Sequence, residues 1–152
     1  MNTINNQGDY RSLSILTISM IMGVVIFSIV SIVIHFTSGS FIADKATMNI
    51  FIIVDYILGF TLLLAARILY KHRVEILKEL NLSSSEKRER FRNISITHLA
   101  LCELSAFFSL ICFILFGHFL FFLIVVIALY EMISRFPSRE KVENIVNSSF
   151  YN

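Results

Sequence analysis

The chain has 152 residues, of which 56% are hydrophobic and only 16% are charged, and its formal net charge is +2. About a quarter of the residues of an ordinary soluble domain are charged. A water-soluble fold of this length cannot bury so much apolar surface, whereas a bilayer solvates it directly. The composition therefore excludes an ordinary soluble domain and predicts an all-α membrane protein.

Four apolar runs are long enough, or nearly so, to match the roughly 20 residues with which a helix crosses the hydrocarbon core. In chain order they are 13–36, 48–70, 94–116 and the shorter 119–133. Their length favours membrane spans over the buried helices of a large soluble complex. The first run is too long for a secretory signal and lacks a cleavage site, so it is expected to be an uncleaved span. We predict a single four-transmembrane-helix bundle over residues 1–152.

The distribution of lysine and arginine predicts the orientation of these spans. The connection 71–93, the tail 134–152 and the N-terminal arm hold most of the basic residues, whereas the other two connections hold only Lys45, offset by Asp44. We expect both termini and the basic loop 71–93 in the cytoplasm. The basic residues concerned are Arg11, Lys71, Arg73, Lys78, Lys87, Arg88, Arg90, Arg92, Arg135, Arg139 and Lys141.

The basic loop also has a helical pattern. Residues 67–82 read RILYKHRVEILKELNL, which favours an amphipathic cytoplasmic extension of the second helix. After it, Ser84 or Ser85 is expected to cap a short charged helix, EKRERFRN, that leads into the third span. The basic side chains either set the topology only or also contact anionic lipid headgroups, and the first reading is favoured.

The two halves of the chain resemble each other. YRSLSIL at 10–16 aligns with FRNISIT at 91–97, and Arg67 aligns more weakly with Arg135 in the second part of each half. The similarity predicts two tandem helical hairpins, a parallel internal repeat. It agrees with both termini lying on the same side of the membrane.

Small and polar residues recur every three or four positions along the third run, so they share one helix face. This third-helix stripe consists of Ser95, His98, Cys102, Ser105, Ser109 and Cys112. The aligned positions of the first run are Ser14, Thr17, Ile21, Val24, Ser28 and Ser31. Small residues allow helices to approach closely in lipid. We predict that the first and third helices meet along these stripes or bind equivalent grooves, and that Ser109→Phe lowers stability.

Ionisable groups at membrane depth are costly, so they are the candidates for chemistry. Glu103 lies near the middle of the third span, Asp55 lies inside the second, and His98 lies nearer the cytoplasm. They form a candidate ion or proton site, although a neutral carboxyl that hydrogen-bonds a neighbouring helix is the favoured reading. Glu131 and Arg135 are expected to pair, since they are four residues apart on one helix.

Other chemistry has no support in the sequence. Cys102 and Cys112 lie on one helix and cannot easily bridge each other, so they are expected to be free thiols used for packing. Metal-ligand spacings, nucleotide-binding loops and catalytic serine or cysteine signatures are absent. We therefore expect no metal, no cofactor, no enzymatic activity and no nucleic-acid or small-molecule partner.

The segment ALCELSAFFSLICFIL at 100–115 resembles the carboxylate helix of the proteolipid (c-type) subunits of rotary ATPases. In that family a carboxyl group at mid-membrane binds the ion, and Glu103 matches its place. The chain departs from the family in its first run, which has Gly23 alone in place of the glycine-rich sequence that lets a rotor ring close. The resemblance implies an ion-binding carboxyl and does not extend to a rotor subunit.

The chain as a whole is similar to small four-helix inner-membrane proteins of Bacteroidota-type bacteria. The similarity rests on ALCE at 100–103 and on RFPSREKVENI at 135–145. It implies a multi-pass protein of the bacterial inner membrane, and it implies no particular activity.

Three functions fit these observations. The favoured one is a structural or accessory subunit of a membrane assembly, since four spans leave little mass outside the membrane. The second is a proton- or cation-translocating oligomer that uses Glu103, with or without Asp55. The third is a partner-binding membrane module, such as an immunity protein, that acts through the basic loop. The expected partners are therefore the lipid bilayer and either further copies of the chain or a larger membrane complex.

Overall fold

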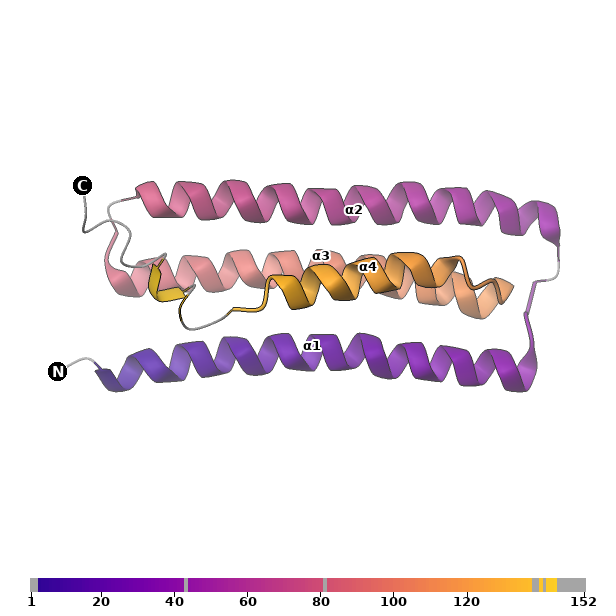
Figure 1. Cartoon of the computed structure of the whole chain (residues 1–152), viewed down its shortest axis with the longest axis horizontal. Coiled ribbons are helices and arrows are strands. Elements are labelled where there is room, and N and C mark those ends of the chain that lie inside the picture. The colour runs from indigo at the N-terminus through magenta and orange to yellow at the C-terminus, as the bar shows by residue number, and fades with distance from the viewer. Residues whose placement is uncertain (1–2, 43, 81, 138–139, 141, 145–152) are drawn as a thin grey trace.

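The computed structural model of the chain is an all-α bundle (Figure 1). It describes residues 3–42, 44–80, 82–137, 140 and 142–144, and the side chains from residue 11 onward. Within this part of the chain the helices are α1 (Thr3–Ser38), α2 (Lys45–Glu79), α3 (Ser84–Phe116) and α4 (Phe121–Ser134). Most of the predicted tail 134–152 lies outside the described residues, including Arg139, Lys141 and positions 138 and 145 of the motif at 135–145.

Three of these helices are long and apolar enough to cross a membrane, namely α1 from Arg11 onward, α2 and α3. This finding agrees with an integral membrane protein. Helix α4 is apolar but has only 14 residues. At 1.5 Å per residue it is about 21 Å long, which is shorter than the roughly 30 Å of the hydrocarbon core. The fourth predicted span therefore contains a helix, which begins two residues later than the apolar run, and its crossing of the membrane stays a prediction.

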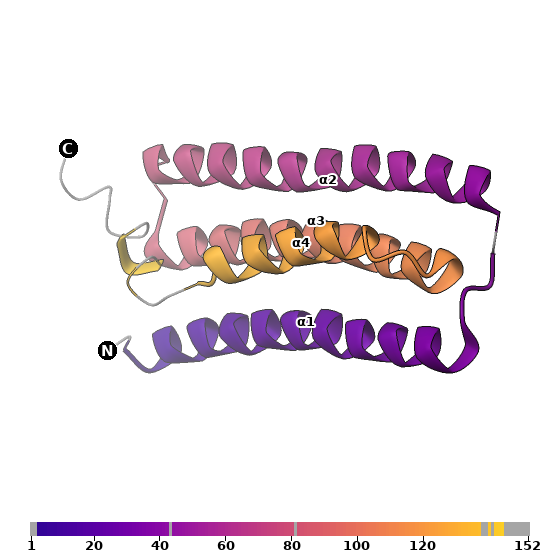
Figure 2. The same cartoon turned by 45° about the vertical axis from the view of Figure 1, so that its right-hand side comes forward.

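Helices α1 and α2 follow each other in sequence but lie on opposite sides of α3 and α4, as both views show (Figures 1 and 2). Helix α3 contacts the other three helices, and its most extensive contact is with α2. Helices α3 and α4 therefore form a packed hairpin, whereas α1 and α2 are joined in sequence with hardly any contact. The internal duplication stays a prediction.

The connection between α1 and α2 contacts the C-terminal end of α3. There the Ile42 N–H donates to the Leu115 carbonyl oxygen at 2.9 Å, which satisfies one of the last carbonyls of α3. Helix α3 then ends at Phe116, and its C-cap residue Gly117 has a φ of 68°, in the left-handed region. A Cβ at Gly117 would lie 2.5 Å from His35 Cε1, so α1 comes very close to this turn. Glycine is thus required here both by the backbone conformation and by the contact.

Side chains cap the first turns of α2 and α3. Asp44 accepts a hydrogen bond from the Thr47 backbone N–H at 2.9 Å and another from its hydroxyl, which lowers the pKa of the Asp44 carboxyl. Ser83 and Glu86 form a capping box, in which Ser83 Oγ donates to Glu86 Oε2 at 2.6 Å. Hydrogen bonds from the Ser83 side chain and backbone lower the pKa of Glu86. The prediction that Ser84 or Ser85 caps this helix is wrong, because Ser83 is the residue with Glu three positions later.

The second helix does continue into the predicted extension, since α2 runs without a break to Glu79, while the cytoplasmic location of the extension stays a prediction. The charged segment EKRERFRN is not a separate short helix but the first part of α3. The last part of α2, the first part of α3 and the start of α1 contact one another through a set of buried side chains, here called the extension cluster. Its residues are Leu13, Tyr70, Val74, Leu77, Phe91 and Ile94, with Val142 packed against it.

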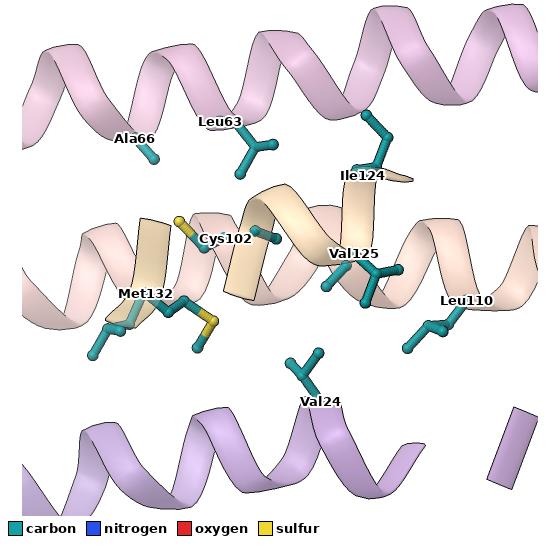
Figure 3. Packing of buried hydrophobic residues seen from close by; sticks show 11 residues of the cluster. Val24, Leu63, Ala66, Cys102, Leu110, Ile124, Val125 and Met132 are labelled. Carbon is teal, nitrogen blue, oxygen red and sulfur yellow. The ribbon is translucent and has the colours of Figure 1, made fainter. Parts of the chain in front are cut away.

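The central core lies where α3 and α4 fill the space between α1 and α2 (Figure 3). Val24 reaches it from α1, Leu63 and Ala66 from α2, and Val125 and Met132 from α4. The other buried members are Leu99, Cys102, Ala106, Leu110, Ile124 and Ala128. Helices α2 and α4 approach each other closely at Gly59 of α2, where a Cβ would lie 2.8 Å from Ile124 Cγ2. Because Gly59 has no side chain, the Ile124 side chain of α4 packs directly against the backbone of α2.

Candidate functional site

Asp55 lies between α2 and α3 and is 1% exposed. The Ser109 hydroxyl lies 2.7 Å from Asp55 Oδ1. The other oxygen, Oδ2, is buried and has no hydrogen-bond partner in the described part of the chain. Buried polar groups are nearly always hydrogen-bonded, so an unpartnered carboxyl oxygen marks a site that needs an explanation.

Two hydroxyls of the third-helix stripe, those of Ser105 and Ser109, bond to α2. Ser109 contacts Asp55, and the Ser105 hydroxyl donates to the Gly59 carbonyl oxygen at 3.4 Å, one turn further along α2. The whole stripe, from Ser95 to Cys112, is buried. The predicted α1 partner of the stripe is therefore wrong for Ser105 and Ser109. Helix α1 contacts a different face of α3, where the Phe27 and Phe107 rings meet edge to face at 5.2 Å.

Glu103 lies on the face of α3 that is turned toward α1. Its Oε1 is 3.8 Å from the place that a Cβ on Gly23 would take, so the carboxyl lies against the glycine backbone. The side chain is partly exposed. No hydrogen bond or ion pair joins it to another residue whose side chain the structure describes. The intramolecular hydrogen bond of the favoured sequence reading is thus not formed by Glu103, whereas Asp55 has one such contact.

His98 is buried near the middle of α3, against α2. Its ring lies 5.1 Å from the ring of Tyr70, and its Nε2 lies 3.9 Å from the Cys102 sulfur one turn away. Asp55 contacts Ser109 and Glu103 lies against Gly23, so the three predicted site residues have different neighbours. The structure does not bring them together into one site.

Glu131 joins α2 to α4. Its Oε2 lies 3.9 Å from Arg135 Nε, which confirms the pairing expected from their spacing, and its Oε1 lies 3.6 Å from Arg67 on α2. The Arg135 guanidinium also lies 5.0 Å from the centre of the Tyr70 ring. A cation over an aromatic face is attracted by the ring quadrupole. Arg67, Tyr70, Glu131, Arg135 and His98 therefore form a polar cluster at one end of the apolar core.

Sequence reasoning missed two features of these contacts. The first is the approach of Tyr70 to His98 and Arg135, for which the sequence carries no local signal, because three helices contribute to it. The second is Lys87, which is completely buried and whose Nζ has no hydrogen-bond partner among the described residues. The burial of Lys87 could have been predicted from its spacing, because it lies four residues before Phe91 and therefore on the same buried face of α3.

The chemistry that these residues offer is that of carboxyl and hydroxyl oxygens. In the described ranges, no three His, Cys, Asp or Glu side chains lie close enough to hold a metal ion together. The two cysteines are buried free thiols at separate places along α3. Among the described residues, two carboxyls of the apolar runs have no ion pair, the enclosed Asp55 and the partly exposed Glu103. Comparison of the chain with models of protein families, with curated proteins and with solved structures gives no match.

Proposed function

We propose that the protein is a four-span subunit of a larger bacterial inner-membrane assembly, and that Glu103 marks the face at which a neighbouring transmembrane helix binds. The observation that carries this proposal is the partly exposed carboxyl of Glu103, which has no hydrogen bond or ion pair with a described side chain. The residue lies two positions from the middle of the apolar run 94–116, roughly 3 Å from the midplane of the membrane by the helical rise. Polar groups at that depth normally face a partner and not lipid.

The arrangement of the helices supports the four-span topology. The start of α1, the α2–α3 connection and the end of α4 lie at one end of the bundle (Figure 1). The exposed basic residues Lys71, Arg73 and Lys78 follow the apolar part of α2 at that same end, so the rule of basic loops assigns it to the cytoplasm. A tag at the C-terminus is expected to be accessible from the cytoplasm only. Its accessibility from the outside would contradict this topology.

A partner helix is favoured over ion transport by the surroundings of Glu103. A cation that has left water needs several oxygen ligands, and no described side chain forms a hydrogen bond or ion pair with this carboxyl. A neutral carboxyl, in contrast, can hydrogen-bond to a single polar group of another helix. The surfaces beside it, Met22 on α1 and Leu104 on α3, are apolar and about half exposed. A helix that covers them also covers the carboxyl.

Site-specific photo-crosslinking in intact membranes tests this proposal. A photo-reactive residue in place of Leu104, which is 56% exposed and adjacent to Glu103, is expected to capture a protein partner. The matched control is Ile53 on α2, which is 60% exposed and is expected to react with lipid alone. In the Leu104 series, Glu103→Leu is expected to abolish the crosslink because the polar contact is lost. Equal capture at both positions, or capture that survives Glu103→Leu, would contradict the proposal.

The other two functions predict different results. An ion-translocating oligomer predicts that dicyclohexylcarbodiimide labels Glu103 at neutral pH and that Glu103→Gln abolishes function. A module that acts through the basic loop predicts loss of the partner when Arg90 and Arg92 are replaced. These two arginines are exposed, whereas Lys87 and Phe91 are buried and their removal would disturb the extension cluster. Replacing the two arginines alone therefore keeps the fold intact.

A further inference from the structure

Asp55 combines a buried carboxyl with very few partners. Its Oδ1 contacts the Ser109 hydroxyl, while Oδ2 is buried with no hydrogen-bond partner among the described residues. The ion pairs of the described side chains join Arg67 and Arg135 to Glu131, and none involves Asp55. An ionised carboxylate that accepts a single hydrogen bond in apolar surroundings is strongly disfavoured, and a buried group of this kind neutralises instead.

The number of hydrogen atoms available around Ser109 also indicates that Asp55 is neutral. The Ser109 hydroxyl has two acceptors within reach, Asp55 Oδ1 at 2.7 Å and the Ser105 carbonyl oxygen at 3.2 Å. A hydroxyl carries one hydrogen, so beside an ionised Asp55 it serves one acceptor at a time. With a proton on Oδ1, Asp55 donates to Ser109, and Ser109 donates to Ser105. Both short contacts then become hydrogen bonds.

We propose that Asp55, Ser109 and the Ser105 carbonyl form a proton-binding site, in which Asp55 holds one exchangeable proton at neutral pH as a neutral acid. The proton lies on Oδ1 and is donated to Ser109 Oγ, while Oδ2 is left as a carbonyl oxygen that is cheaper to bury than an anion. This site does not depend on the partner proposed for Glu103, because it lies at the α2–α3 contact and is enclosed within the chain.

The neighbouring helices bring no charge that would replace this proton. The titratable group that faces Asp55 from α3 is the thiol of Cys112. Helix α4 carries its ionisable side chains, Tyr130 and Glu131, in its last turns, and Glu131 pairs there with Arg67, three turns along α2 from Asp55. Helix α1 lies on the far side of the bundle from α2 (Figure 1). The proton is therefore the cation that the described surroundings supply for this carboxyl.

Infrared spectroscopy of the purified protein in lipid at neutral pH tests the site through the carbonyl stretching band of a protonated carboxyl. The wild-type protein is expected to show a band that is lost in Asp55→Asn and kept in Glu103→Gln. Transfer to heavy water is expected to shift this band to lower frequency, because the proton exchanges. In Ser109→Ala the band is expected to move to higher frequency, since the acid no longer donates a hydrogen bond.

The Ser109→Ala result keeps the test decisive even if Asp55→Asn does not fold. The proposal is overturned if the wild-type and Asp55→Asn spectra coincide in this region, or if Ser109→Ala leaves the band in place. It is also overturned if replacing potassium by sodium or lithium in the buffer removes the band, because a metal cation then occupies the site in place of the proton.

Discussion

Gly59 allows α2 and α4 to pack closely, and its replacement by alanine is expected to separate them. A Cβ at this position would lie 2.8 Å from Ile124 Cγ2 and 3.3 Å from Cγ1 and Cδ1. The Ile124 methyl group cannot easily turn away, because a β-branched side chain in a helix has one strongly preferred χ1 rotamer. The two helices must therefore shift, or the isoleucine must adopt a strained rotamer.

The expected magnitude combines two opposing contributions. Overpacking a core by a methyl group costs about 1–3 kcal/mol, while alanine is preferred over glycine within a helix by about 1 kcal/mol. Gly59→Ala is therefore expected to lower the free energy of unfolding by about 1 kcal/mol. Ile124→Ala alone is expected to cost about 2–5 kcal/mol through the cavity it leaves. In that background the clash is gone, so Gly59→Ala is expected to raise stability by up to about 1 kcal/mol.

Gly59→Ala is thus expected to lower the free energy of unfolding when Ile124 is present and to raise it when Ile124 is replaced by alanine. Equilibrium unfolding in mixed micelles of mild detergent and dodecyl sulfate, followed by circular dichroism, measures both effects. Gly23→Ala is the matched control, because a Cβ there would meet Glu103 Oε1 at an ordinary contact distance of 3.8 Å. This control is expected to leave stability unchanged or slightly raised. If Gly59→Ala has the same effect with Ile124 present and absent, the close approach of α2 and α4 is refuted.

The remaining predictions concern the helix ends and the polar cluster. Gly117→Ala is expected to cost more stability than Gly39→Ala in the same unfolding assay. Both have positive φ, but the second has no atom within 4 Å of the added Cβ. Ser83→Ala is expected to cost about 1 kcal/mol at neutral pH through loss of the cap. Because folding lowers the pKa of Glu86 from its usual 4.5, the stabilisation by its charged form is present above 4.5 and is lost as the pH falls below 4.5 through the lower folded-state pKa, so the cost of Ser83→Ala is expected to shrink there in a pH titration. Arg135→Ala is expected to cost about 1 kcal/mol and to weaken tyrosine near-ultraviolet dichroism, since its ion pair and its aromatic contact are both lost; an unchanged tyrosine signal would contradict that contact.

The helices of this chain follow closely from local sequence. Long apolar runs give α1, α2 and α3, and the spacing of Val74 and Leu77 gives the extension of α2, because each pattern is contained in one segment. The start of α3 was also encoded locally. Ser83 is followed three residues later by Glu86, which is the spacing of a capping box, and choosing among three serines by that rule gives the correct residue.

The partners of the helix faces could not be derived in the same way. The third-helix stripe is buried as its composition indicates, but a stripe does not specify which helix covers it. The sequence placed Asp55 and Ser109 on different helices without a signal that they meet. That contact depends on the position of α3 between α1 and α2, which is settled by the packing of all four helices together. The separate locations of Asp55, Glu103 and His98 have the same origin.

The separation of α1 from α2 has a consequence for how the chain acquires its structure. Ribosomes make the N-terminal half first, and domains generally begin to fold in that order. Here the first two helices find nearly all their native neighbours in α3 and α4, which emerge last. The first two helices are therefore expected to stay largely unpacked until α3 and α4 have been made. A chain that stops after α2 is therefore expected to form almost no native tertiary structure.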